Sequence, residues 1–176
     1  KTYVPFPYFP ISTQFGTVVS GQAVFSKFKM DSTTSLVFPF PPENPFWYNQ
    51  FYLERLAQFV WHAEPDSLLI VNIHLEAWSA SHRELQARML VEYLKPIISK
   101  QATLIVGDFN VPPFYTPNKK EISDEQNQYE LETTLNILKE GLELTEMLDD
   151  STATLSSHYT FSSGTPTLKI DHIFYR

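Results

Sequence analysis

The chain has 176 residues, 43% of them hydrophobic, which is enough for one globular domain with a sizeable core. Its 13 Lys and Arg residues against 20 Asp and Glu give a formal charge of −7, so the sequence as a whole does not attract the phosphates of nucleic acid or of an anionic membrane. The absence of cysteine excludes disulfides, a thiolate nucleophile and zinc–thiolate sites, and leaves the compartment open. No apolar run is long enough to span a bilayer. A phosphate ligand therefore needs a local site, and a metal is expected beside it.

The first third of the chain is predicted to consist of strands separated by proline-rich loops. Residues Lys1 to Gln14 combine proline with aromatics, which disfavours both helix and central strand, so an irregular surface segment is expected. Strands are predicted over Phe15 to Ser20, Gln22 to Phe28 and Ser32 to Phe40, which are rich in Val, Phe and Thr. A second proline-rich loop, Pro39 to Pro45, follows them.

The pattern from Phe51 to His62 fits either a helix or a strand, and its aromatic and β-branched residues favour the strand. Alternation along this strand would place Arg55 on the same face as Phe59. Arg55 is then either a phosphate contact or, the favoured interpretation, a structural ion-pair partner at the margin of the sheet.

A strand followed by a long helix is predicted next. Leu68 to Leu75 is apolar except for two polar residues, as expected for a buried strand. Ser81-His-Arg-Glu84 matches a capping box, so a helix should begin there and run through Leu94. Pro96 should kink or end it.

The central strand of the prediction ends in polar residues. Leu104 to Val106 form a short apolar run typical of a strand covered on both faces, and Gly107 then allows a substrate or another backbone to approach closely. Residues two apart in a strand share a face, so Asp108 and Asn110 should point the same way while the residue between them points into the packing. The alternative is a simple turn, because Pro112-Pro113 follows at once.

The C-terminal third is predicted to contain a second helix and a last strand. Ser123-Asp-Glu-Gln126 is another capping box, Gly141 is well placed to end the helix, and Leu168 to Tyr175 should form the strand. The apolar stripe of the helix consists of three leucines: Leu131, Leu135 and Leu138. Strands interleaved with two long helices, without an internal repeat, predict a single α/β or α+β domain over residues 1–176.

Polar side chains interrupt three apolar strands near their ends: His74, Asp108 with Asn110, and Asp171. Burying such groups without a partner is costly, and the simplest partners are one another. Alternation puts Asp171 and His172 on opposite faces, so Asp171 is chosen for the shared site. The remaining histidines are expected to be structural: His62, His82, His158 and His172.

Five segments occur in a characteristic order and spacing: Gly21-Gln-Ala-Val-Phe-Ser26, Asn72-Ile-His-Leu-Glu-Ala77, Arg83-Glu-Leu-Gln86, Gly107-Asp-Phe-Asn110 and Ile170-Asp-His-Ile-Phe174. From about Gly21 to its end, the chain resembles the endonuclease/exonuclease/phosphatase superfamily, which includes deoxyribonuclease-like nucleases, neutral sphingomyelinases and inositol-polyphosphate phosphatases. The combination of Gly-Asp-Phe-Asn with a preceding His-Leu and a following Ile-Asp-x-Ile is specific to it.

The resemblance implies a four-layer sandwich of two packed mixed β-sheets flanked by helices, and Mg²⁺- or Mn²⁺-dependent hydrolysis of a phosphoester by a phosphodiesterase, phosphatase or nuclease. It implies that His74 binds the scissile phosphate and stabilises its developing charge. Asp108 would orient or deprotonate the attacking water, or hold a metal, and Asn110 would donate to the phosphoryl oxygen and assist Asp108 at the metal. Asp171 would fix the orientation of a catalytic histidine.

Two elements of the family pattern are expected to be missing from this chain. The family has a metal-binding glutamate, usually after glutamine, before the matched region, and no Gln-Glu at the end of an apolar strand precedes Gly21. Its catalytic histidine follows in a Ser-Asp-His segment, and this chain ends at Arg176. We therefore expect a domain incomplete at both termini. The alternative is a non-catalytic member of the fold that binds a ligand or partner.

The substrate class stays open between nucleic acids, lipid head groups, inositol phosphates and small phosphoesters. The acidic charge and the lack of a Lys/Arg cluster do not favour nucleic acid. The aromatic segments Tyr3 to Phe9 and Phe46 to Phe51 could support a lipid-facing entrance, which is a hypothesis only. A monomer is expected.

Overall fold

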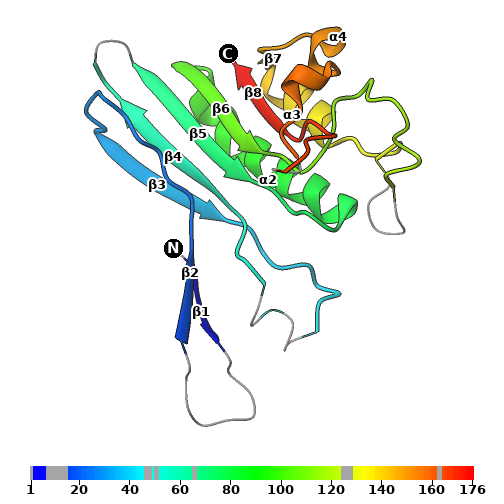
Figure 1. Cartoon of the computed structure of the whole chain (residues 1–176). Coiled ribbons are helices and arrows are strands. Elements are labelled where there is room, and N and C mark those ends of the chain that lie inside the picture. The colour runs from blue at the N-terminus through cyan, green and yellow to red at the C-terminus, as the bar shows by residue number, and fades with distance from the viewer. Residues whose placement is uncertain are drawn as a thin grey trace.

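The structure, a computed structural model, describes residues 2–6, 16–45, 49, 52–64, 67–123, 129–161 and 164–176. Its main element is a six-stranded mixed sheet with the strand order β3-β4-β5-β6-β8-β7 (Figure 1). The strands are β3 (Ser32–Val37), β4 (Leu56–His62), β5 (Leu68–His74), β6 (Ala102–Asp108), β7 (Thr145–Glu146) and β8 (Asp171–Tyr175). The chain thus has an α/β fold, as predicted.

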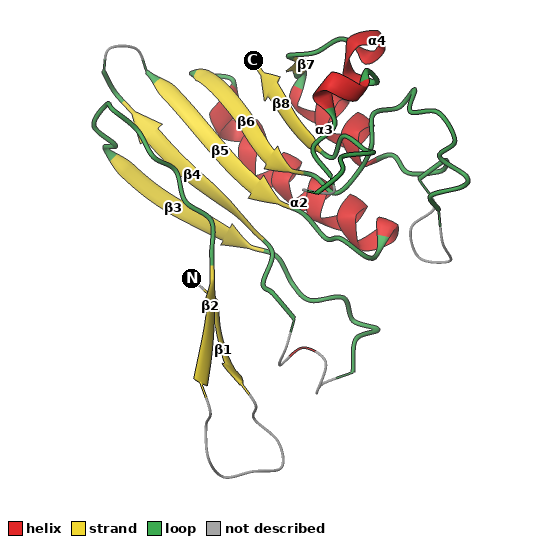
Figure 2. Cartoon of the chain, in the orientation of Figure 1, coloured by secondary structure: helices red, strands yellow, loops and turns green. Residues whose placement is uncertain are grey.

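β5 and β6 pair in parallel, and the helix α2 (Ala80–Ile98) connects them. The pairs β3–β4, β4–β5, β6–β8 and β7–β8 are antiparallel. The helices α2 and α3 (Thr134–Leu142) lie together behind the sheet, and the short helix α4 (Asp150–Ala153) lies near β7 (Figures 1 and 2). The helices therefore cover one face of the sheet.

The hydrophobic core lies between the sheet and these two helices. Phe59 of β4, Val71 of β5 and Ile105 of β6 are fully buried there, with Leu90 of α2 and Leu138 of α3. Every second residue of each strand points to this face, so the residues between them point to the opposite face. Burial of this alternating set is the main source of the sheet's stability.

The second face of the sheet carries the segment from residue 21 to 31, which crosses it in front of β4. Gln22 Nε2 donates to the carbonyl oxygen of Leu56 at 3.1 Å, and at the other end His62 Nδ1 lies 2.9 Å from the carbonyl oxygen of Lys29. A second sheet packed over this face is not present among the described residues. The four-layer sandwich therefore stays a prediction.

The N-terminal predictions need two corrections. Thr2–Phe6 forms a strand, β1, that pairs with β2 (Gly16–Ser20), although an irregular segment was expected from its prolines. Pro5 is tolerated because β1 is the edge of a two-stranded sheet. The strand expected over Gln22 to Phe28 is also wrong, since these residues form no strand, residues 27 and 28 bend, and the side chain of Phe25 is 94% exposed.

Two helix boundaries also differ from the prediction. α2 begins at Ala80, because Ser79 and not Ser81 is the N-cap and accepts from His82 N. Pro96 lies inside the last turn of α2 and does not end it before Ile98.

In α3, Gly141 lies within the helix, where a Cβ would come within 2.8 Å of Val91, so this glycine allows α3 to approach α2. The helix ends at Glu143, which adopts the left-handed conformation, and Leu131 lies outside the helix and is exposed.

Several predicted features lie outside the described residues: 7–14 of the first loop, Phe46 to Tyr48, the start of the strand predicted from Phe51, and 124–126 of the second capping box. Within the described residues, a helix with the length and hydrophobicity of a transmembrane span is not found.

Candidate functional site

The polar residues at the strand ends form one row across the sheet. His74 at the end of β5 pairs with Asp108 at the end of β6, and Asp108 pairs with Asp171 at the start of β8. All three occupy the face opposite to the helices, because Ile73, Gly107 and His172 alternate with them toward the other face. The structure thus brings together side chains that are far apart in the sequence, at the lower right edge of the sheet in Figure 1.

Gly107 allows the ends of β5 and β6 to lie this close. Its φ is +132°, and a Cβ at this position would lie 2.1 Å from the carbonyl oxygen of Ile73. Just beyond it, Leu75 N donates to the carbonyl oxygen of Asp108 at 2.9 Å and joins the two strand ends. The prediction that Gly107 accommodates another backbone is confirmed.

Asn110 fixes the position of Asp108. Its φ of 54° turns the chain out of the strand, and its backbone N–H donates to Asp108 Oδ1 at 2.8 Å. Its side-chain Nδ2 donates to the carbonyl oxygen of Leu75 at 2.9 Å, which leaves one N–H of the amide for another acceptor. Phe109 points into the core between His172 and Phe174, as predicted.

Arg55 contacts His74 and, together with burial, lowers its pKa. Arg55 Nη1 lies 2.6 Å from His74 Nε2, so this nitrogen accepts and carries no proton. Burial, followed by the charge of Arg55, lowers the pKa of His74 to about 4 against the opposing charges of Asp171 and Glu76. His74 is therefore a neutral imidazole at physiological pH.

Arg55 itself is an unusual cation. It is only 8% exposed, its Nε has no hydrogen-bond partner, and within the described ranges it has no carboxylate within 4 Å. A structural ion pair on the face of Phe59 was expected for Arg55. The predicted face is wrong, because Arg55 precedes β4 and reaches His74 on the opposite face, and no ion pair of Arg55 is formed within the described residues.

Asp108 is the carboxylate whose environment is most perturbed. Burial raises its pKa to about 6, and the charge of Asp171 adds to this, while the Asn110 N–H and the charges of Arg55 and Arg83 oppose it. Asp108 Oδ2 lies 3.6 Å from His74 Nε2, a separation that would suit an ion pair. They do not form one, since His74 is neutral and Nε2 already accepts from Arg55. Asp108 is thus half-buried beside a like charge.

His172 belongs to a separate cluster on the helix-covered face, as its alternation with Asp171 predicts. Its Nδ1 lies 2.7 Å from Glu146 Oε1 and its Nε2 lies 2.9 Å from the carbonyl oxygen of Val111. Burial alone would raise the pKa of Glu146, but His172 and Lys169 lower it below its usual value. The structural roles expected for His62, His172 and His82 are thus seen in their contacts, since His82 Nε2 lies 2.9 Å from the carbonyl oxygen of Pro39.

A buried ion pair involving α2 holds the loop that follows His74 against this helix. Arg83 of α2 donates from Nη1 to the carbonyl oxygen of Glu76 at 2.8 Å and pairs with both carboxylate oxygens of Glu132 at 2.6 and 2.7 Å. Gln86 Oε1 accepts from Glu76 N at 2.8 Å. Arg83 and Gln86 are one turn apart on α2, so this helix positions the end of β5.

No role was predicted for Glu76 or Arg83, and the contact of Arg55 with His74 was not predicted. In the sequence, Arg55 and Glu76 are charged residues beside apolar ones, and Arg83 belongs to the Arg-Glu-Leu-Gln segment. The contact between Arg55 and His74 could not be predicted from the sequence, because these residues are 19 positions apart in the chain.

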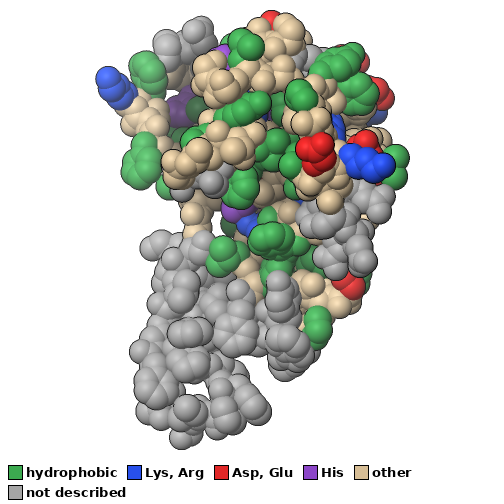
Figure 3. All heavy atoms as spheres, turned by 45° about the vertical axis from the view of Figure 1, so that its right-hand side comes forward, with side chains coloured by type: hydrophobic (Ala, Val, Ile, Leu, Met, Phe, Trp, Pro, Cys, Tyr) green, Lys and Arg blue, Asp and Glu red, His purple; other side chains and the backbone are tan. Residues whose placement is uncertain are grey.

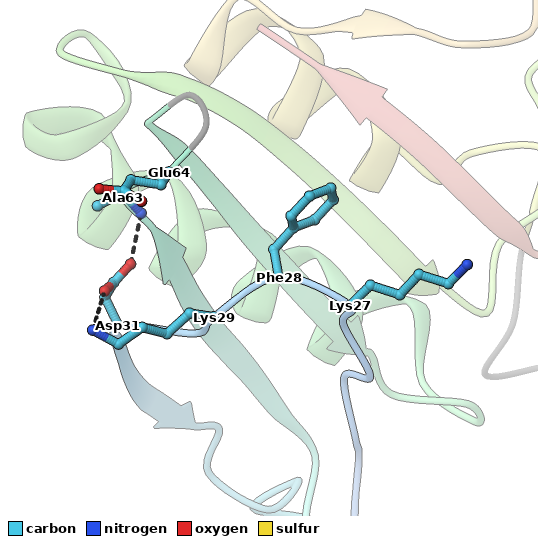
Figure 4. Close-up of a pocket in the computed structure, with 6 residues that line it drawn as sticks. All are labelled: Lys27, Phe28, Lys29, Asp31, Ala63 and Glu64. Atoms are coloured by element: carbon cyan, nitrogen blue, oxygen red, sulfur yellow. Dashed lines mark hydrogen bonds and ion pairs between the residues drawn. The ribbon is translucent and has the colours of Figure 1, made fainter.

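A pocket of about 490 Å³ lies at the opposite end of β4 from the row and is lined by Lys27, Phe28, Lys29, Asp31, Ala63 and Glu64 (Figure 4). Asp31 accepts from Ala63 N at 2.7 Å and lies 3.4 Å from Lys29 Nζ. The contact with Ala63 joins β3 to β4 at the end of the pair, so the role of Asp31 is structural.

Two acidic side chains of the row lie side by side. Asp108 and Asp171 lie directly opposite each other, an arrangement that destabilises the sheet unless a proton or a cation neutralises it. Within the part of the chain that the structure describes, no group of three or more His, Cys, Asp or Glu side chains is placed to hold a metal. Two carboxylates suit Mg²⁺, which keeps several waters and is held in proteins by one or two carboxylates.

Comparison with known proteins was made with the sequence and with the fold. The family model described as "Endonuclease/Exonuclease/phosphatase family" matches residues 3–176. No curated protein matches the sequence.

Solved structures with a similar fold include an endonuclease/exonuclease/phosphatase from Bacteroides vulgatus (14% identity, TM-score 0.50, 84% of this chain and 54% of that chain). TDP2 from Caenorhabditis elegans (13%, 0.50, 84% and 40%) and a family protein from Bacteroides thetaiotaomicron (15%, 0.49, 84% and 51%) are similar to the same extent. The chain spans about half the length of the solved structures it matches.

The match of the family model over nearly all 176 residues agrees with the α/β fold and with the order of the five segments. The chain belongs to the endonuclease/exonuclease/phosphatase family.

Proposed function

We propose that the full-length protein is a metal-dependent phosphoester hydrolase and that this chain contributes its phosphate-binding row. The observation that carries the proposal is the register of His74, Asp108 and Asp171 across three neighbouring strand ends, next to the buried guanidinium of Arg55. A cation beside paired carboxylates, at the edge of a rigid sheet, suits the binding of a phosphoryl group together with a divalent cation.

Arg55 is proposed to bind a non-bridging phosphoryl oxygen. A buried guanidinium without a carboxylate partner is costly, and a phosphate would supply the missing anion. In the free protein its Nη1 donates to His74, so phosphate binding exchanges a neutral acceptor for a charged one. His74 then stabilises the charge that develops on the phosphoryl group.

Asp108 and Asn110 are proposed to act on the attacking water. A carboxyl with a pKa of about 6 is close to the value suited to a general base near neutral pH. The backbone N–H of Asn110 holds one carboxylate oxygen of Asp108, and the free N–H of its amide is available to a phosphoryl oxygen. Asp171, opposite Asp108, raises the pKa of that carboxyl and is proposed to orient a catalytic histidine.

In the alternative role of Asp108, Mg²⁺ or Mn²⁺ would be held by its carboxylate and by the amide oxygen of Asn110, with Asp171 as a further ligand from the opposite strand. The like-charge pair is the structural feature that fits such a cation. When bound, the metal would supply charge stabilisation to the phosphoryl oxygens.

Small phosphoesters are the favoured substrate class. On the face shown in Figure 3, Lys and Arg side chains of the described residues are scattered among acidic and hydrophobic ones. The formal charge of −7 likewise gives no footprint for a nucleic-acid backbone.

The test is an assay of the full-length protein with Mg²⁺ on phosphomonoester and phosphodiester substrates, with wild type, Asp108→Ala and Glu64→Gln. Glu64 is exposed and lies in the distant pocket of Figure 4, so its variant is the control. We expect Asp108→Ala to lower kcat by at least about 100-fold and the control to be unchanged. An inert wild type would favour the non-catalytic, ligand-binding alternative, and a fully active Asp108→Ala would refute the mechanism.

A further inference from the structure

A second pocket lies directly beside the row. It has a volume of about 310 Å³ and opens between the turn at residues 41–45 and the loop that precedes α2. The residues of its wall that matter here are Glu43, Asn44, Tyr52, Glu76 and Trp78.

Tyr52 and Glu76 connect this pocket to the proposed phosphate-binding residues. The Cζ of Arg55 lies 6.0 Å from the centre of the Tyr52 ring, and the Tyr52 hydroxyl donates to Glu76 Oε1. Glu76 follows His74 by two residues, and its charge acts on the imidazole. Arg55 and His74 are thus connected to the wall of this pocket through Tyr52 and Glu76.

Two buried polar atoms in the wall have no partner among the described residues. Glu76 is fully buried, and although its Oε1 accepts from Trp78 N at 2.9 Å, its Oε2 has no hydrogen bond. Asn44 Nδ2 is also buried without an acceptor. Buried polar atoms almost always form a hydrogen bond with protein, water or ligand. An acceptor and a donor without partners in the wall of one pocket therefore indicate that the pocket has an occupant.

We propose that this pocket binds the alcohol portion of the substrate, and that this portion is a neutral, hydroxyl-bearing group of the sugar or polyol class. This inference rests on the proposed function, because it assigns the leaving-group side of the same site.

The chemistry of the wall selects this class. A hydroxyl group both donates and accepts, so vicinal hydroxyls can satisfy Glu76 Oε2 and Asn44 Nδ2 together. Trp78 is 60% exposed and offers an apolar ring surface to the C–H faces of such a ligand. An anionic extension is disfavoured by Glu43 and Glu76, since no Lys or Arg of the described residues lines the pocket. A cationic head group would pair with Glu76 but leave the Asn44 donor without an acceptor.

Binding is tested first, with a probe that carries no phosphate. The full-length protein is titrated with myo-inositol, and the side-chain amide of Asn44 and the indole N–H of Trp78 are followed by ¹H–¹⁵N NMR. We expect saturable shifts of both signals, a 5- to 10-fold weaker affinity in Asn44→Leu and no change in Glu64→Gln. Shifts with choline chloride but not with inositol, or no shift at all in the wild type, would overturn the inference.

Hydrolysis of glycerol phosphate and of phenyl phosphate then separates this inference from the proposed function. We expect Asn44→Leu to lower kcat/KM about 5- to 10-fold for glycerol phosphate and less than 2-fold for phenyl phosphate. Equal effects on the two substrates would contradict the pocket assignment and leave the hydrolase intact. Inositol binding without hydrolysis of either substrate would support the pocket and refute the proposed function.

Discussion

At the scale of single residues, the site depends on two side chains whose pKa values are displaced from their usual values. Asp108 and His74 sit side by side, yet burial raises the pKa of the first to about 6 and lowers that of the second to about 4. Arg55 lies beside them without a carboxylate within 4 Å among the described residues. Groups held away from their preferred states are typical of functional sites and carry a cost in stability.

Asp108→Asn should stabilise the chain at neutral pH. The carboxyl titrates near 3.8 when unfolded and near 6 when folded, so between these values the folded state binds more protons and loses stability as the pH rises. Asn has no charge to bury and can still accept from Asn110 N. Urea denaturation at pH 7.5 should show a gain of about 1–2 kcal/mol, allowing for solvent screening, and the gain should vanish near pH 4.

Asp31→Asn is the matched control for that measurement. The hydrogen bond from Ala63 N lowers the pKa of Asp31, so its ionised form stabilises the fold and the substitution should not raise stability at pH 7.5. Equal gains in the two variants would show that the effect of Asp108 comes from overall charge and not from its burial.

Arg55→Gln should raise the pKa of His74 above 4, because a positive charge next to the imidazole is removed. Burial remains the larger cause, so the value should stay below the ordinary 6.5. Titration of the His74 ring signals by NMR measures this directly. A pKa of His74 that is the same in the wild type and in Arg55→Gln would show that the contact with Arg55 is not formed in solution.

At the scale of secondary-structure elements, the row depends on how closely the strand ends and α2 approach each other. Gly107 lets β6 approach Ile73 of β5, and Arg83 of α2 holds the loop after His74. Gly107 and Arg83 position the backbone of the site and take no part in its chemistry. Replacing either residue should therefore lower the free energy of unfolding.

Gly107→Ala should destabilise the fold by about 2–4 kcal/mol. The added Cβ would lie 2.1 Å from Ile73 O, and the φ of +132° is strained for any other residue. Gly164→Ala is the matched control, because nothing lies within 4 Å of a Cβ there. Thermal unfolding should show a large loss of Tm for the first variant and almost none for the second. Similar Tm values would contradict the close approach of β5 and β6.

Arg83→Met should cost about 3–5 kcal/mol, because it leaves the fully buried carboxylate of Glu132 without its partner. The double variant Arg83→Met/Glu132→Leu should recover most of this loss. Chemical denaturation of the single and double variants measures the difference. A single variant as stable as the wild type would mean that Glu132 is not buried in solution.

The elements themselves were predictable where one physical signal dominated. The apolar runs of β5 and β6 and the polar residues at their ends follow from alternation and burial, and so does the inward position of Phe109. The Gln22 to Phe28 prediction failed because its Val and Phe residues have strand propensity, whereas the segment crosses the sheet without joining its ladder. Ser79 and Ser81 both suit an N-cap, and the choice between them depends on tertiary contacts.

At the scale of the whole molecule, the two faces of the sheet have different tasks. One face is covered by α2 and α3 and supplies the core, while the other carries the row, Arg55 and the crossing segment at residues 21–31 (Figure 2). The α/β class was predictable from the alternation of strands and helices. The partnership of Arg55 with His74 was not, because it depends on where the chain turns before β4.

The most direct test of the phosphate-binding row is a ¹H–¹⁵N NMR titration of the chain with inorganic phosphate. We predict saturable shifts at the Arg55 Nε–H, the His74 ring and the backbone amides of Asp108 and Asp171, all lost in Arg55→Gln and retained in Glu64→Gln. Shifts elsewhere on the chain, or shifts at the row that persist without Arg55, would contradict the account.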